Sequence, residues 1–164
     1  MKMSILELIE KGESKTAEFK ETLPGGDTIA KTVIAFSNTA GGKIIIGVDD
    51  KRQIVGIPDS KLFELQDKIV SIIYDRCYPN ILPEIYTITV DNKILLVIEV
   101  FRSSLIPYYL KNKGKNNGTY VRIGATNRLA NRENILELER QRNYISYDEE
   151  INYDVGFEGL CAWV

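Results

Sequence analysis

A run of three isoleucines, Ile44 to Ile46, most restricts how this chain can fold. It belongs to the segment from Lys43 to Val48, in which apolar residues follow one another instead of alternating with polar ones. Short unbroken apolar runs that are rich in β-branched residues are typical of strands buried on both faces. Such a strand needs another layer on each side, so we expect a mixed central sheet flanked by helices.

Apolar residues at helical spacing predict four helices. The first is expected to begin at Ser4, because Ser4 followed by Glu7 has the pattern of a capping box, and to end near Gly12. The others are expected, in chain order, over about 27–39, from Asp59 or Ser60 to before Pro79, and from Asn131 through Ile135 and Leu138.

The remaining patterned segments predict strands. Segments 85–90 and 93–101 are expected to form a hairpin around Asp91-Asn92. Further expectations are a strand at 53–57 that pairs with the buried strand, a short strand at 105–110 bent by Pro107, a flexible polar loop at 111–118, and a strand at 119–123. This order of elements predicts a single α+β, or mixed α/β, domain over residues 1–143.

Residues 144–164 differ from the predicted domain. They hold five acids, three tyrosines and no base, and they show no helical or strand period. Two interpretations stay open: an acidic, tyrosine-containing tail, or a truncated linker that begins a further element.

Positive charge is concentrated in one segment. Residues 102–143 hold nine basic and three acidic side chains, a net charge of +6 in a chain whose net charge is -2. The stretch from Lys111 to Arg128 has no acid, and its cations are Lys111, Lys113, Lys115, Arg122 and Arg128. Clustered cations bind phosphate in some proteins and form a solvated loop in others, so the charge pattern alone leaves both interpretations open.

Several common catalytic and nucleotide-binding devices are missing from the sequence. The chain has no histidine, which excludes a Ser-His pair and histidine ligands to zinc. Gly41-Gly42-Lys43 lacks the P-loop spacing, and no hydroxyl residue follows Lys43. The same glycines are wrongly spaced for a dinucleotide fingerprint and precede a strand, so we expect neither ATP nor NAD.

The sequence also gives no sign of export or membrane insertion. Cys77 and Cys161 show no paired spacing, no window approaches the roughly 20 apolar residues of a membrane span, and Glu7 comes too early for a secretory signal. We therefore expect a cytoplasmic protein without a disulfide framework or a membrane partner.

Three carboxylates are candidates for a metal site. Glu13 and Glu18 lie five residues apart, and Asp49 follows the buried strand, with Asp50 as the alternative. Oxygen ligands suit Mg²⁺ or Mn²⁺, which can activate water at a phosphodiester without histidine. Lys20 is expected to share one face of an extended segment with Glu18 and to contact phosphate. In the competing interpretation, these acids are surface residues and Asp49-Asp50 is only a turn.

Five segments carry a resemblance to a known family. They are Glu13-x4-Glu18-Phe19-Lys20, Ile34 to Gly42, Ile45 to Asp50 with Ile54 to Ile57, Pro107-Tyr108, and Thr119 to Gly124. Over about residues 8–140 they resemble the Schlafen AlbA-2 domain, which is also described as a divergent DNA-binding domain of bacterial transcriptional regulators. The resemblance implies an α/β fold that binds nucleic acid, with DNA more expected than RNA and no cofactor required for binding.

The resemblance also implies alternatives to a DNA-binding regulator. Some Schlafen relatives are metal-dependent endoribonucleases that act on structured RNA, and Glu13, Glu18 and Asp49 match their carboxylate pattern. The animal enzymes have a duplicated, pseudo-dimeric core, so a single domain of this size would need a homodimer to make an equivalent groove. A third alternative is a protein-interaction or dimerisation domain that binds no nucleic acid.

Overall fold

The computed structural model describes residues 3–143. Its elements, in chain order, are α1 (Ile5–Lys11), β1 (Ala17–Lys20), α2 (Gly26–Asn38), β2 (Gly42–Ile46), the 3-10 helix η1 (Asp59–Lys61), α3 (Leu62–Arg76), β3 (Cys77–Tyr78), β4 (Glu84–Val90), β5 (Lys93–Val100), β6 (Tyr109–Leu110), α4 (Gly114–Gly118), β7 (Tyr120–Ile123) and β8 (Thr126–Leu129). A C-terminal helix occupies residues 132–143. The predicted tail, 144–164, lies outside the described residues.

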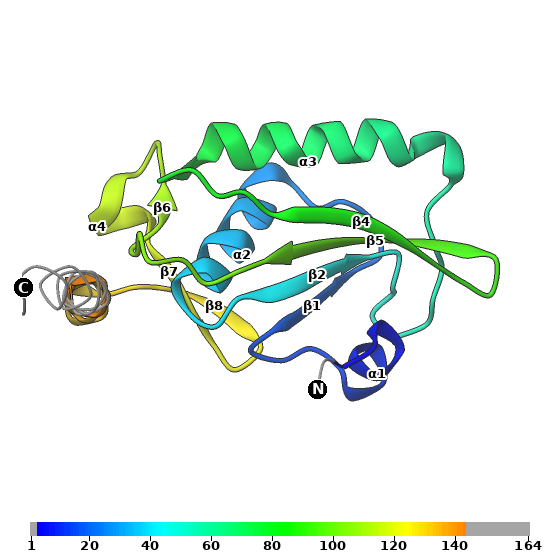
Figure 1. The fold of residues 1–164 in the computed structure, drawn as a ribbon, viewed down its shortest axis with the longest axis horizontal. Helices are drawn as coiled ribbons and strands as arrows, with labels where there is room; N and C mark the ends of the chain where they lie inside the picture. The colour runs from blue at the N-terminus through cyan, green and yellow to red at the C-terminus, as the bar shows by residue number, and fades with distance from the viewer. Residues whose placement is uncertain (1–2, 144–164) are drawn as a thin grey trace, which may run out of the picture.

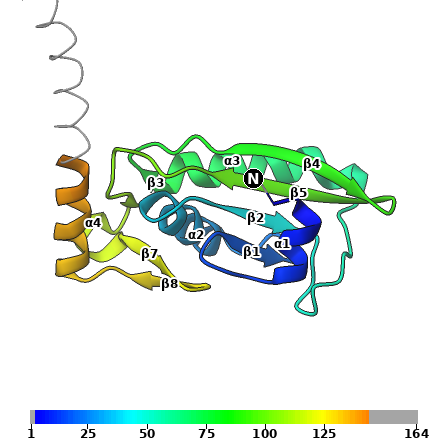
Figure 2. The same ribbon diagram turned by 60° about the horizontal axis from the view of Figure 1, so that its bottom comes forward.

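A four-stranded mixed sheet forms the centre of the fold, as the sequence predicted. Its strand order is β1-β2-β5-β4, with β1 parallel to β2 and the other neighbours antiparallel. Helices α2 and α3 cover one face, whereas α1 packs on part of the other (Figures 1 and 2). The fold class is therefore α+β, with helices on both sides of a mixed sheet.

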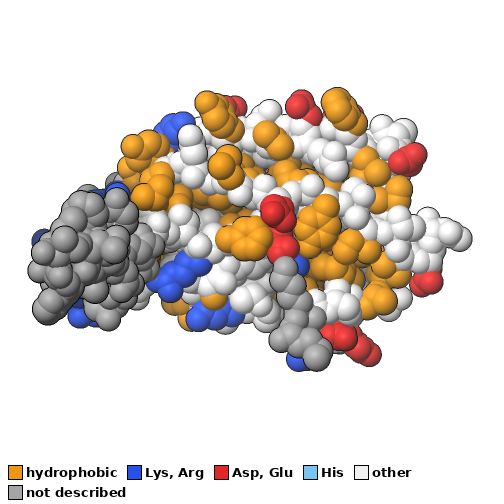
Figure 3. All heavy atoms as spheres, viewed as in Figure 1, with side chains coloured by type: hydrophobic (Ala, Val, Ile, Leu, Met, Phe, Trp, Pro, Cys, Tyr) orange, Lys and Arg blue, Asp and Glu red, His pale blue; other side chains and the backbone are white. Residues whose placement is uncertain are grey.

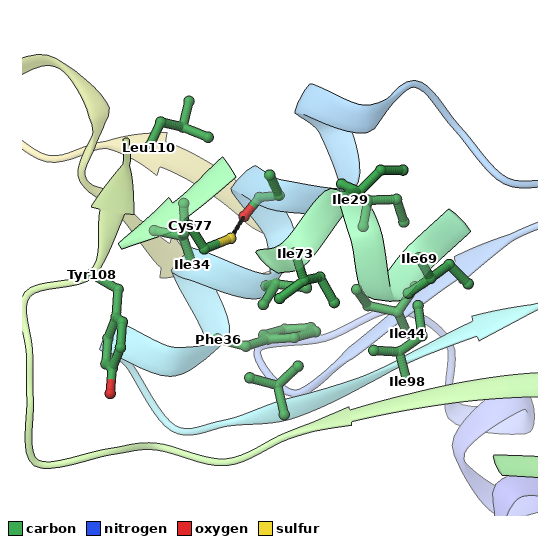
Figure 4. Close-up of a cluster of buried hydrophobic side chains, with 14 of the residues drawn as sticks. Ile29, Ile34, Phe36, Ile44, Ile69, Ile73, Cys77, Ile98, Tyr108 and Leu110 are labelled. Atoms are coloured by element: carbon green, nitrogen blue, oxygen red, sulfur yellow. Dashed lines mark hydrogen bonds between the residues drawn. The ribbon is translucent and has the colours of Figure 1, made fainter. Parts of the chain in front are cut away.

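Isoleucines fill the core on both faces of the buried strand β2. Ile44 and Ile46 belong to the cluster beneath α2 and α3, and Ile45 belongs to the cluster beneath α1. Figure 4 shows Ile44 and Ile98 of neighbouring strands below Ile69 of α3, with Phe36 of α2 beside them. Since successive side chains of a strand point to opposite faces, an unbroken apolar run supplies both clusters.

Local signals place several boundaries where the sequence predicted them. Ser4 caps α1, because its hydroxyl oxygen accepts a hydrogen bond of 3.2 Å from the backbone N–H of Glu7. Gly41 joins α2 to β2 with a φ of 74°, and a Cβ there would lie 2.7 Å from the carbonyl oxygen of Val100. The C-terminal helix begins after Asn131, whose side-chain oxygen accepts from the N–H of Asn134.

Three predictions of local structure were wrong. Residues 53–57 do not form a strand beside β2 and make only isolated bridges. β2 already pairs with β1 on one edge and with β5 on the other, so it has no free edge for a third strand. Residues 111–118 contain α4, and the strand expected at 105–110 is limited to Tyr109 and Leu110. β8 was missed altogether, because its sequence, Thr-Asn-Arg-Leu, has no apolar alternation.

Two further observations complete the description of the domain. Within residues 3–143, every helix is too short or too polar to traverse a lipid bilayer. Cys77 is buried against the carbonyl oxygen of Ala30, and burial raises the pKa of its thiol to about 12. A thiol with such a pKa stays protonated and unreactive at neutral pH.

Candidate nucleic-acid interface

Most of the cations predicted to contact phosphate lie at one end of the molecule. Lys111 follows β6, Lys113 precedes α4, Lys115 lies within α4, and Arg128 lies in β8. All four side chains are exposed. These elements gather at the end opposite the β4–β5 turn in Figure 1, and most of the Lys and Arg side chains visible in Figure 3 lie over that end.

Hydrogen bonds order the backbone that carries these lysines. The N–H of Lys111 donates to Arg76 O at 2.8 Å, which ties it to the end of α3, and the N–H of Lys113 donates to Leu110 O at 3.1 Å. Lys115 Nζ forms an ion pair of 2.9 Å with Glu139 in the C-terminal helix. Lys111, Lys113 and Arg128 have no ion-pair partner within residues 3–143, so no neighbouring carboxylate neutralises their charges there.

A groove of about 320 Å³ lies between β7, the end of α2 and the C-terminal helix. Lys15 and Arg102 line it, and Arg102 donates a hydrogen bond of 2.5 Å to Gln141. Glu137 also lines the groove, and its pKa is lowered by a hydrogen bond from Gln141 and by the charge of Arg140. Lys15 and Arg102 were not predicted from the sequence, because they come from distant segments that only folding brings together.

Arg122 is buried instead of facing solvent. Its side chain is 1% exposed and stacks over Phe36, with 5.0 Å between the guanidinium carbon and the ring centre. The guanidinium donates to Ser14 O, to Ala17 O at 3.0 Å and to Asn127 Oδ1 at 2.9 Å. Arg122 therefore joins β7 to the outer edge of β1, and the expectation that it contacts phosphate does not fit this placement.

Glu18 connects Arg122 to Lys20. Glu18 Oε2 lies 2.7 Å from Arg122 Nη2, and Glu18 Oε1 lies 3.3 Å from Lys20 Nζ. As predicted, Glu18 and Lys20 share one face of β1, whereas Phe19 packs into the cluster beneath α1. The Lys20 side chain is 32% exposed, so it reaches solvent only in part.

The three candidate metal ligands do not come together. Glu13, Asp49 and Asp50 line a pocket of about 280 Å³ next to Phe19, whereas Glu18 points to the opposite face of β1. Glu13 Oε1 accepts a hydrogen bond from the N–H of Phe19, and Asp49 Oδ1 accepts from the N–H groups of two residues in its own turn.

Glu13 and Asp49 therefore accept hydrogen bonds from the nearby backbone, whereas Glu18 pairs with cations. No group of three Asp, Glu, Cys or His side chains within residues 3–143 is close enough to share a metal ion. The arrangement does not fit the Mg²⁺ or Mn²⁺ site expected for a nuclease.

Asn38, at the end of α2, is a structural residue that the sequence analysis did not single out. It is 2% exposed. Its side-chain amide donates to Tyr108 O at 2.9 Å and to Tyr120 O at 2.8 Å, and its Oδ1 accepts from the N–H of Tyr108 at 2.7 Å. An asparagine within the helical pattern at 27–39, three residues before Gly41, was the available signal, because a buried amide needs partners.

Comparisons with known proteins agree with this fold. The family model described as Schlafen, AlbA_2 matches residues 13–131. The chain is similar to the solution NMR structure of the N-terminal domain of a RecG-related protein from Nitrosomonas europaea, whose name refers to an ATP-dependent DNA helicase. The TM-score is 0.59 at 29% identity, over 79% of this chain and 94% of that one.

A second solved structure shows likeness in fold alone. It is the crystal structure of the DIP2311 protein from Corynebacterium diphtheriae, with a TM-score of 0.56 at 22% identity over 77% of this chain. The match covers 24% of that protein, so the present chain spans about a quarter of its length. No curated protein matches the chain. Because the family model covers well over half of its sequence, this chain belongs to the Schlafen AlbA_2 family.

Proposed function

We propose that this domain binds nucleic acid, with DNA as its ligand, and acts as the binding module of a transcriptional regulator. The observation that carries the proposal is the cluster of exposed cations at the end formed by β6, α4 and β8. Lys111, Lys113 and Arg128 are exposed there, in a segment with a net charge of +6. The name of the RecG-related neighbour, which refers to a DNA helicase, supports nucleic acid as the ligand.

The proposed contacts act mainly through phosphate. Lysine and arginine side chains neutralise phosphates and release condensed counterions, so affinity falls as salt rises. Lys111, Lys113 and Arg128 have no ion pair to break among the described residues, so each contacts phosphate without that cost. Contacts of this type position a strand and carry no sequence information by themselves.

The test is a binding titration of the 164-residue chain by fluorescence anisotropy. Duplex DNA, single-stranded DNA and structured RNA are compared at about 50 and 200 mM salt, a range over which phosphate contacts weaken strongly. The proposal expects the tightest binding to duplex DNA and a steep fall with salt. Absent or salt-insensitive binding to all three ligands would contradict it, and a preference for RNA would overturn the choice of DNA.

A pair of double variants locates the interface. Lys111→Gln with Lys113→Gln is expected to reduce the slope of log affinity against log salt by about 2, one unit for each lost phosphate contact. Lys61→Gln with Lys68→Gln removes two exposed lysines from the α3 region and is the matched control. Equal effects of the two double variants would show that binding is not centred on the β6–α4 end.

A further inference from the structure

The outer edge of β4 is open. β4 stands last in the strand order, so among the described residues its outer edge has no strand partner. The turn Asp91-Asn92, with positive φ at both residues, closes the β4–β5 hairpin and pairs Val90 directly with Lys93. Because hydrogen-bonding direction alternates along a strand, Ile85, Thr87 and Thr89 point their N–H and C=O groups outward, away from β5.

This edge lacks the features that normally discourage strand addition. Residues Glu84 to Val90 contain no proline and no lysine, and their pairing with β5 runs over seven residues without a bulge. The only charge is Glu84, at one end of the strand. Long, regular edges of β-branched and aromatic residues are templates for further pairing.

The flank of α3 at this edge is apolar and exposed. Phe63, Val70 and Tyr74 recur at intervals of seven and four residues, which places them on one stripe of the helix, and they are 83%, 53% and 65% exposed. Arg76 forms an ion pair with Asp27 of α2, so α2 lies along a different flank. The stripe therefore faces the β4 side of the sheet, where hydrophobic side chains line the α3 rim in Figure 3.

We propose that the β4 edge and the α3 stripe form a homodimer interface, in which β4 of a second copy adds antiparallel to β4. A two-fold axis at Thr87 pairs Thr87 with its own copy and Ile85 with Thr89 of the other copy. This register joins all three outward-pointing residues of each strand, which gives six hydrogen bonds. It also places Tyr86 opposite Ile88 of the other copy, and aromatic and β-branched side chains make favourable cross-strand pairs.

The same axis explains the exposed stripe on α3. A two-fold axis perpendicular to the sheet keeps both α3 helices on the same face of an eight-stranded sheet. Their apolar flanks then face each other across the axis in antiparallel orientation, so Phe63, Val70 and Tyr74 are covered by the same stripe of the other copy. A second copy satisfies the edge and the stripe together, whereas an extended peptide would satisfy the edge alone.

Cysteine cross-linking tests the register. Thr87 and Thr89 are both exposed, lie on the same strand and point to the same face. In the proposed dimer, Thr87→Cys faces its own copy at about 5.5 Å between Cα atoms, a distance that permits a disulfide. Thr89→Cys faces Ile85 and lies four residues from its own copy, roughly 13 Å along the strand, so it is the matched control.

Both cysteine variants are made in a Cys161→Ser background of the 164-residue chain, and the buried Cys77 is left in place. Mild oxidation is expected to convert most of Thr87→Cys to a covalent dimer and little of Thr89→Cys. Sedimentation velocity of the chain with native β4 is expected to show twice the monomer mass at high micromolar concentration. Thr87→Pro, which removes an outward N–H and no bond to β5, is expected to sediment as a folded monomer.

Three outcomes would overturn the proposal: a chain that stays monomeric at high micromolar concentration, equal cross-linking of the two cysteine variants, or a folded Thr87→Pro variant that remains dimeric. If Thr87→Pro does not fold, the cysteine pair and the mass of the chain decide. Nucleic-acid binding at the β6–α4 end does not require this interface, so each proposal can fail without the other.

Discussion

The two edges of the central sheet differ in how their outward backbone groups are hydrogen-bonded. At the β1 edge, the guanidinium of Arg122 donates to the carbonyl oxygens of Ser14 and Ala17 and pairs with the buried Glu18. At the β4 edge, the outward groups of Ile85, Thr87 and Thr89 have no strand beside them among the described residues. The β1 edge is closed by a side chain from the distant β7–β8 hairpin, whereas the β4 edge is open to a further strand.

This contrast shows where the fold places its polar interactions. The closed edge is covered by the buried side chain of Arg122 from β7, so an unpaired carbonyl there would lose its contact with water. The open edge lies at the rim, where water or a second copy can satisfy the same groups. The buried edge therefore has its outward carbonyls hydrogen-bonded by a side chain, whereas the exposed edge does not. The two edges should respond differently to substitutions.

Removing the hydrogen bonds that Arg122 donates to the β1 edge should lower the stability of the domain most. Arg122→Ala leaves Glu18 Oε2 and two edge carbonyls without their donor in a buried site, with only Lys20 still paired to Glu18, so we expect the free energy of unfolding to fall by about 3–5 kcal/mol. Urea denaturation followed by circular dichroism measures it. Arg128→Ala, an exposed residue on the partner strand β8, is the control and should cost less than about 0.5 kcal/mol.

A double variant separates the buried charge from the hydrogen bonds. Glu18→Gln removes the charge that Arg122 neutralises, so adding it to Arg122→Ala should recover part of the loss. The carbonyls of Ser14 and Ala17 remain without donors, which keeps the double variant less stable than the native chain. Strict additivity of the two substitutions would show that Glu18 and Arg122 are not coupled.

Proline substitution compares the two sides of β4 directly. Because hydrogen-bonding direction alternates along β4, Ile88 points its N–H toward β5. Ile88→Pro should therefore lower the free energy of unfolding by about 3 kcal/mol or more. Thr87 points its N–H outward, and Thr87→Pro should cost less than about 1 kcal/mol in the monomer. Denaturation at low micromolar concentration keeps dimerisation out of the comparison; similar losses would contradict the assigned hydrogen-bonding direction.

The closed edge also depends on the attachment of β7 to α2. Asn38→Ala leaves the carbonyl oxygens of Tyr108 and Tyr120 and the N–H of Tyr108 without their partner, and we expect a loss of about 2–3 kcal/mol. Asn38→Asp keeps the acceptor for the N–H but removes the donors. Denaturation curves should therefore place both variants below the native chain; a native-like Asn38→Ala would show that water replaces the amide.

The arrangement of helices around the sheet could be predicted from the sequence because its signals are local. The Ser4 cap, the apolar spacing of α2 and α3 and the β4–β5 turn each depend on residues within one element. β8 and α4 were not predicted, because polar segments of this kind form ordered structure only through contacts with the rest of the chain. Lys115 of α4, for example, forms an ion pair with Glu139 of the C-terminal helix.

The candidate site was predictable in composition and not in arrangement. The concentration of cations in residues 102–143 is visible in the sequence, and four of the predicted side chains, Lys111, Lys113, Lys115 and Arg128, are exposed. The burial of Arg122 could not be foreseen, because its partner Glu18 lies 104 positions earlier. Nor could the spacing of Glu13 and Glu18 reveal that Glu13 joins the pocket beside Phe19 and Asp49 while Glu18 pairs with Arg122.

The smallest predicted effect concerns charge on the open edge. Glu84 lies directly opposite Glu99, and that carboxylate already accepts a hydrogen bond from Tyr86, whose pKa is raised by burial and by Glu99. Like charges at opposite positions of a sheet repel, so Glu84→Lys should stabilise the monomer by about 0.5 kcal/mol. Glu84→Gln, which removes the charge without reversing it, should give a smaller gain.

Salt distinguishes this electrostatic cause from a change in packing. Glu84 is exposed, so raising the salt concentration from about 0.05 to 1 M shortens the screening length and should abolish most of the difference between Glu84→Lys and the native chain. A gain that persists in high salt would indicate that the lysine side chain packs along β4. In that event apolar contact along β4 would account for the gain, and relief of repulsion between Glu84 and Glu99 would not.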